Sequence, residues 1–306
     1  ETDERARYYR EEIVNNLALK KLKAAFDTWC AIWFWPADKL DSAPTPRTFE
    51  NPTENTAQIV FELRDLHQFF HWELEFPDVF ASTDTGFDAV IGNPPWENLQ
   101  ANLGEYFSNY DPLFRTYGRM ESLQQMKRLF LANADLEGAW LTYCSNFKDI
   151  ANCVKNWFSP FGDGLHGGNT FPVGSRGSQL YQIWSARRTG HVSYAHPSHP
   201  YRVQGGGRVF TYKLFLEQAL ALTREHGYLG LILPGNIYTD HGSSKLRQHL
   251  IKQNSWIWLF GFENKEGIFD IHRSFKFGPI IVQKSGSTNI VRCAFMRRMI
   301  TDWEHP

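Results

Sequence analysis

The sequence has little that would hold a metal ion or a disulfide framework. Its 306 residues include four cysteines, Cys30, Cys144, Cys153 and Cys293, and no two of them form a Cys-x-x-Cys pair. Zinc sites and disulfide-rich domains need closely spaced cysteines, so neither is expected. His191, His196 and His199 lie in a Pro- and Ser-rich stretch without cysteine or acid nearby, and we expect no metal there. Free thiols predict a cytoplasmic protein.

Long hydrophobic runs are also missing. The longest one near the N-terminus reads "WCAIWFWPA", residues 29–37, which is far too short to span a bilayer. No signal-peptide pattern precedes it. We therefore expect no membrane partner.

Acidic residues are absent from two stretches, 165–215 and 271–301, although the formal net charge is only −1. Both stretches are basic, and such segregation suits a protein with one phosphate-facing side. The alternative is two solvated basic stretches that never meet. The first stretch holds Arg176, Arg187, Arg188, Arg202, Arg208 and Lys213, and the second Arg273, Lys276, Lys284, Arg292, Arg297 and Arg298.

The apolar pattern alternates between strand and helix in the C-terminal half. It predicts a helix over 209–226 capped by Gly227, a helix over 243–253, and strands over 87–91, 228–234, 255–262 and 278–285. This alternation predicts a mainly parallel α/β sheet. The remaining segments divide into a helix over 4–35, a loop over 38–57, helices over 119–158 and a Gly-, Ser-, His- and Pro-rich loop system over 159–207.

One strand is followed by a rigid turn, in the stretch "GFDAVIGNPPW" of residues 86–96. Two prolines fix the backbone, so the Asn93 amide oxygen and the Pro94 carbonyl can point at one spot. Two converging acceptors suit an exocyclic amine, and the Trp96 ring can stack on the heterocycle that carries it. The alternative is an ordinary Pro-Pro turn with a core tryptophan.

This stretch resembles the Asn-Pro-Pro-aromatic motif of the gamma-type N6-adenine DNA methyltransferases. Downstream, "YKLFLEQALAL", "HGYLGLILPGNIYTDHG", "KLRQHL" and "GIFDIHRSFKFGPIIVQKSG" are similar to successive elements of these enzymes. Upstream, "FHWELEFPDVF" resembles the large methylases of combined restriction–modification and BREX- or DISARM-type phage-defence systems. The matched stretches cover about 60–100 and 208–290.

The resemblance implies methyl transfer from S-adenosylmethionine to N6 of an adenine flipped out of double-stranded DNA. Asn93, Pro94, Pro95 and Trp96 would form the catalytic motif, with N6 bound by the Asn93 side chain and the Pro94 carbonyl. Trp96 and Phe269 would face each other across a gap of about 7 Å that admits the base. Phe215 matches a position that touches the cofactor. Other subunits of a restriction or phage-defence system are the implied partners.

The glycine-rich cofactor turn of the family, Asp-Pro-x-x-Gly-x-Gly, has no counterpart in residues 1–85. "SPFGDG" at 159–164 has a faint likeness but follows the motif, and Asp78 and Glu75 are weak matches to the cofactor's acidic ligand. We therefore expect the C-terminal part of a methylase domain, with negligible methyl transfer by residues 1–306 alone.

The implied fold is a Rossmann-like S-adenosylmethionine-dependent methyltransferase sheet, incomplete on its N-terminal side, with a helical insertion. Its predicted parts are an N-terminal helix and loop (1–57), the methyltransferase core (58–100 and 208–300) and the insertion (101–207). Three alternatives stay open: transfer to cytosine N4, transfer to a protein glutamine, and a DNA-binding module without catalysis.

Overall fold

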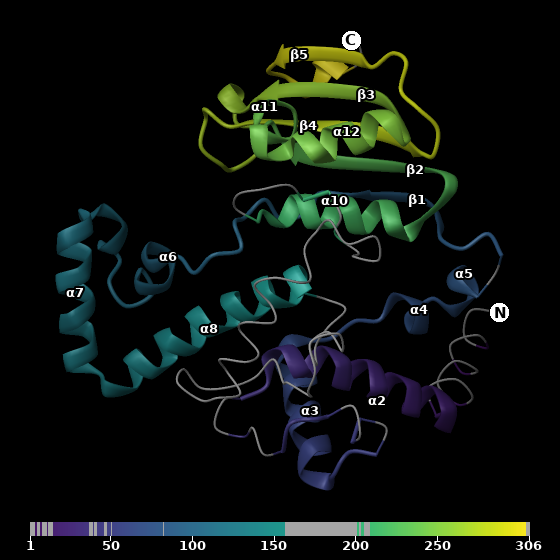
Figure 1. Cartoon of the computed structure of the whole chain (residues 1–306). Coiled ribbons are helices and arrows are strands. Elements are labelled where there is room, and N and C mark those ends of the chain that lie inside the picture. The colour runs from purple at the N-terminus through teal and green to yellow at the C-terminus, as the bar shows by residue number, and fades with distance from the viewer. Residues whose placement is uncertain are drawn as a thin grey trace.

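The fold was analysed in a computed structural model of the whole chain (Figure 1). It describes residues 15–36, 39, 42–45, 48–49, 51–81, 83–156, 201, 203–204 and 209–303, together with Glu4, Arg7 and Glu11. The predicted loop system of 159–207 therefore lies almost wholly outside the described residues, and so do "SPFGDG", the three histidines and the basic residues Arg176 to Arg208.

The centre of the fold is a five-stranded sheet of order β1-β2-β4-β3-β5. Its strands are β1 (Phe87–Gly92), β2 (Thr223–Pro234), β3 (Asn254–Glu263), β4 (Lys276–Lys284) and β5 (Arg292–Arg297). The pairs β1–β2 and β3–β5 are parallel, whereas β4 runs antiparallel to both β2 and β3. Four of these five strands run in one direction, so the predicted mainly parallel sheet is confirmed, with β4 as the one antiparallel strand among the described residues. A parallel return usually crosses the sheet through an α-helix, whereas the connection between β3 and β4, residues 264–275, contains only the short helix η7 (Asn264–Glu266).

Two helices pack on this sheet and enclose its main core. They are α10 (Thr211–Leu222) and α12 (Ser244–Lys252), and their apolar faces meet those of β2, β3 and β4. The predicted Gly227 cap is wrong, since α10 ends at Leu222. Thr223 is already extended and pairs with Phe87 of β1, so strand pairing ends this helix early. Between β2 and α12 lie α11 (Asn236–Thr239) and η6 (His241–Ser243).

A separate helical layer precedes the sheet. It contains α2 (Leu17–Ala31), η2 (Ile32–Phe34), α3 (Glu54–His67), α4 (Trp72–Glu75) and α5 (Pro77–Phe80). Ile59, Val60 and Leu63 of α3 pack with Ala31 and Trp35. The predicted boundary at 57/58 falls inside α3, which packs against the preceding helices as one layer.

The insertion is helical as far as the structure describes it. It holds α6 (Leu103–Phe107), η4 (Phe114–Thr116), α7 (Arg119–Ala132) and α8 (Ala134–Asn156) around an aromatic core. Outside the insertion, the short helix η8 (Ile300–Trp303) follows β5. In Figure 1 the sheet lies at the top, α2 and α3 at the bottom, and α8 between them, where α8 contacts η2. None of the helices within the described ranges is long and apolar enough to cross a membrane.

Candidate active site

The motif residues lie at one edge of the sheet. Asn93 directly follows β1, whose last residue, Gly92, pairs with Leu231 of β2. The predicted position of Asn93, at the carboxyl end of its strand and beside strand β2, is thus confirmed. Strands β1, β2, β3 and β5 share one direction, so their carboxyl ends meet at this edge, which we call the carboxyl edge. Ligands of open α/β sheets bind at such edges.

The Asn-Pro-Pro-Trp turn is held in place by the start of α10. The Thr211 hydroxyl donates to the Pro95 carbonyl at 2.7 Å and lies 3.0 Å from the Glu97 carbonyl, which also accepts from the Thr211 amide at 2.9 Å. One step further, the Leu99 amide donates to the Val209 carbonyl at 2.9 Å. The motif is therefore fixed from both sides, by its prolines and by residues more than a hundred positions away.

Within this turn Asn93 keeps its hydrogen-bonding groups free of the described residues. Its side chain is exposed and bonds to none of them, while Pro94 behind it is buried. The Pro94 carbonyl likewise has no partner in this part of the chain. An amide oxygen and a carbonyl oxygen on a rigid turn can accept the two hydrogens of an exocyclic amine without losing existing bonds.

Trp96 is wedged among aromatic side chains. Its indole N–H donates to the Ile232 carbonyl at 3.3 Å, and its ring lies 6.0 Å from that of Phe277 at an interplanar angle of 30°. The Phe269 ring meets Trp96 edge to face, with 6.1 Å between ring centroids and an angle of 85°. The structure therefore brings Trp96 and Phe269 together but corrects the predicted gap between them, because the two rings are in direct contact.

Two residues at this point were missed by sequence reasoning. Phe277, the second residue of β4, stacks on Trp96. In the sequence, the one hint of this role is that Phe277 is a large apolar residue at the start of a predicted strand. Asn264 is fully buried and holds the loop of Phe269. Its side chain accepts from the Phe269 amide at 3.0 Å and donates to the carbonyls of Phe269 (3.0 Å) and Ile271 (2.9 Å). A lone asparagine in a loop gives no sequence signal of such a role.

Phe215 lies on α10, the helix whose first residue clamps the motif. Its side chain is 50% exposed, which leaves it accessible to a ligand. Lys213, two residues earlier, is buried and its ammonium lies 3.4 Å from the Asp240 carboxylate. Partial burial acts to raise the pKa of Asp240, but the Gly242 amide and Lys213 lower it below its ordinary value. This pair connects α10 to the segment that follows β2.

Asp78 and Glu75 do not join this site. Both lie on the short helices α4 and α5, where the Val79 carbonyl accepts from the Gly86 amide at 3.1 Å, next to the first residue of β1. Glu75 instead lies 3.6 Å from Lys23 of α2. The amino end of β1 is the end opposite Asn93, so the structure does not bring these two acids together with the motif.

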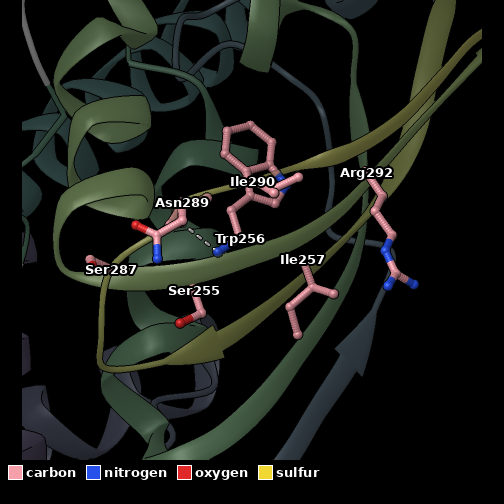
Figure 2. Close-up of a pocket in the computed structure, with 8 residues that line it drawn as sticks. Ser255, Trp256, Ile257, Ser287, Asn289, Ile290 and Arg292 are labelled. Atoms are coloured by element: carbon pink, nitrogen blue, oxygen red, sulfur yellow. Dashed lines mark hydrogen bonds between the residues drawn. The ribbon is translucent and has the colours of Figure 1, made fainter.

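The described residues form only one side of the candidate site. No glycine-rich turn and no group of three metal-ligating side chains lies among them. Strand β1 is the outermost strand of the sheet as described, and its Ile91 is 84% exposed. A shallow hollow of about 420 Å³ exists elsewhere, between Ser255–Ile257 and the β4–β5 connection (Figure 2). It lies at the amino end of β3, the end opposite Asn93.

Together these features define an α/β protein with a candidate site at the carboxyl ends of its strands. The model of a protein family described as the Eco57I restriction-modification methylase matches residues 5–127 and 190–269. The chain belongs to this family. The predicted α/β methyltransferase fold agrees with that membership, which implies S-adenosylmethionine as the methyl donor.

Two solved structures are similar to parts of the chain. A Listeria monocytogenes protein described as a class I S-adenosylmethionine-dependent methyltransferase matches 30% of the chain at 18% identity, with a TM-score of 0.26. A Vibrio vulnificus protein described as a modification subunit of a type I restriction enzyme matches 81% at 12% identity, with a TM-score of 0.29. The matches span 28% and 54% of those two chains. No curated protein matches significantly.

Proposed function

We propose that the chain carries the target-base side of a DNA methyltransferase acting on adenine N6. The observation that carries this proposal is Asn93, an exposed amide on a rigid turn at the carboxyl edge, beside an aromatic ring. Its Oδ1 and the Pro94 carbonyl accept the two N6 hydrogens, and this leaves the nitrogen lone pair directed away from the turn. Positioning of this kind supplies a large part of the rate in group transfer.

Within the proposal each part of the site has one task. S-adenosylmethionine supplies an electrophilic methyl group when bound, and the described residues contribute no glycine-rich turn to hold it. Trp96 provides the apolar face for the flipped base, and α10 keeps that face in register with Asn93 through Thr211. Because Phe269 contacts Trp96 directly, a base that stacks between the two rings must displace the loop that Asn264 holds.

The test is methyl transfer from tritiated S-adenosylmethionine to a mixed-sequence DNA duplex by the full-length protein. Asn93→Ala is expected to abolish transfer while changing the free energy of unfolding by less than about 0.5 kcal/mol, because an exposed side chain without partners contributes little. Asn109→Ala is the matched control, since Asn109 is also exposed but lies beyond α6, away from the carboxyl edge.

Each outcome bears on one part of the proposal. Full activity of Asn93→Ala would remove the catalytic assignment. Label found in N4-methylcytosine, or in the glutamine of a protein substrate, would keep the amine site but change the substrate. Binding of DNA without any transfer would favour the DNA-binding module that lacks catalysis.

A further inference from the structure

Three cations surround one buried carboxylate at the carboxyl edge. Glu263, the last residue of β3, is only 7% exposed. The Glu263 carboxylate lies 3.0 Å from the Lys265 ammonium, 3.4 Å from that of Lys276 and 3.5 Å from the Arg298 guanidinium. The strand register explains the cluster, because Glu263 pairs with Lys276 and Phe262 pairs with Arg297. Lys265, Lys276 and Arg298 together are called the cation cluster below.

The cation cluster carries more charge than Glu263 can neutralise. Hydrogen bonding to Lys265, followed by the charges of Lys265 and Lys276, lowers the pKa of Glu263, so this carboxylate is ionised at neutral pH. One negative charge then faces three positive ones. The three cationic side chains are about half exposed, at 51% for Lys265, 48% for Lys276 and 51% for Arg298.

One further arginine lies at the same place. The Arg273 guanidinium donates to the Lys265 carbonyl at 2.8 Å, whereas the unpartnered Nε of Arg297 is buried and does not face solvent. Glu266 and Asp270 lie in the β3–β4 loop and are exposed, but neither forms an ion pair with a described residue. The edge therefore offers several N–H groups to an anion that arrives from solvent.

The cation cluster shares the carboxyl edge with the candidate active site. Lys276 directly precedes Phe277, which stacks on Trp96. The Lys276 carbonyl accepts from the Gly235 amide at 2.7 Å, which ties the cluster to the end of β2, the strand beside β1. Because successive side chains of a strand point to opposite faces, the cluster and the Phe277–Trp96 stack lie at the same end of β4 but on the two faces of the sheet.

The same basic stretch contains two cations that the fold sends elsewhere. Lys284, at the other end of β4, donates to the Thr223 carbonyl and lies 3.8 Å from the Glu225 carboxylate. The Arg292 guanidinium lies over the Trp258 ring, 5.4 Å from its centroid, and its side chain is seen beside the hollow in Figure 2. The basic stretch of 271–301 is therefore split between the two ends of the sheet.

We propose that Lys265, Lys276 and Arg298 bind a phosphate of the DNA strand that carries the target base. This inference rests on the proposed function. Phosphate contacts set the register of a protein on DNA, and a phosphate fixed at the carboxyl edge would set the position of the strand from which the nucleotide is flipped. The Glu263 carboxylate attracts all three cationic side chains and so holds them near one another.

The experiment compares two double variants that lose the same net charge. Lys276→Gln with Arg298→Gln removes cations of the cluster, whereas Lys284→Gln with Arg292→Gln removes cations at the opposite end. Binding of the full-length protein to a mixed-sequence duplex is followed by fluorescence anisotropy between 50 and 300 mM KCl. Each removed phosphate contact is expected to reduce the slope of log K against log salt concentration by about 0.9, and to weaken binding at the lowest salt roughly tenfold.

Because the cluster is proposed to bind a single phosphate, the cluster variant should lose about 0.9 units of slope, and the control variant none. Equal losses in both variants, an unchanged cluster variant, or no DNA binding by the unsubstituted protein would each overturn the inference. Lys276→Arg should retain the slope, and Lys276→Gln alone replaces the double variant if the latter does not fold. Methyl transfer in the same samples separates the two proposals. If the unsubstituted protein transfers methyl groups but the cluster variant keeps the same salt slope, only the phosphate site is overturned. If the cluster variant loses slope but the unsubstituted protein transfers no methyl groups, only the methyltransferase proposal is overturned.

Discussion

The centre of the sheet contains a glycine that no other residue can replace. A Cβ added to Gly278 of β4 would overlap the Phe260 carbonyl oxygen, lie 2.8 Å from the Phe260 carbonyl carbon and lie 3.3 Å from the Gly261 Cα. All three atoms are backbone, so no side chain can rotate away. Gly278→Ala must therefore push β3 and β4 apart, in the middle of the sheet that carries Phe277 and Lys276.

The cost can be worked from this geometry. Overpacking costs about 1–3 kcal/mol, and separating the two strands locally forfeits about two ladder hydrogen bonds at about 1 kcal/mol each. We expect Gly278→Ala to lower the free energy of unfolding by about 3–5 kcal/mol and the melting temperature by roughly 10 °C. Gly230→Ala in the neighbouring strand β2 is the control, because its Cβ would first meet the Ile91 Cγ1 at an ordinary 3.8 Å.

Both variants are measured by thermal unfolding followed by circular dichroism. Gly230→Ala should unfold within a few degrees of the unsubstituted protein. A melting temperature of Gly278→Ala that is equally unchanged would show that β3 and β4 are not packed as closely as the structure has them, and would also weaken the register on which the cation cluster depends.

Two further predictions concern packing outside the sheet centre. Trp96→Ala should lower the free energy of unfolding by about 2–3 kcal/mol, which is below the range for a fully buried ring because Trp96 is half-buried. Trp96→Phe should lower the free energy of unfolding by less, because the new ring can keep the stack on Phe277. Equal losses in urea denaturation would contradict this. His71→Ala should cost about 3 kcal/mol, since it removes the partner 2.7 Å from the Asp27 carboxylate, which is only 3% exposed. Asp27→Asn combined with His71→Ala should recover part of that loss, and no recovery would refute the pairing.

Several features of the site were predictable because they are local. The order strand, glycine, asparagine, two prolines and an aromatic ring fixes a strand end and a rigid turn whatever the rest of the chain does, since proline sets its own φ angle. The same holds for the apolar periodicity that predicted strands near those of the sheet and the two helices α10 and α12 packed on it. The resemblance to DNA methyltransferases rested on these stretches, and the family match agrees with it.

Other features depend on contacts between residues far apart in the chain. The direction of β4 follows from a connection that has no crossover helix, and the end of α10 follows from the pairing of Thr223 with Phe87. The predicted base gap failed for the same reason. Aromatic spacing marks Trp96 and Phe269 as large rings, but only packing decides that they touch each other and that Phe277 lies against Trp96.

The sequence by itself determined the strand–turn motif, the α/β class and the presence of basic stretches, because these are set by neighbouring residues and by periodicity along the chain. The tertiary structure alone decided which charges act together. Lys276 and Lys284 lie on one strand, yet they end at opposite edges of the sheet, one with Glu263 and one with Glu225. A strand of nine residues spans about 30 Å, so charges that are close in sequence serve different surfaces once the strand is extended.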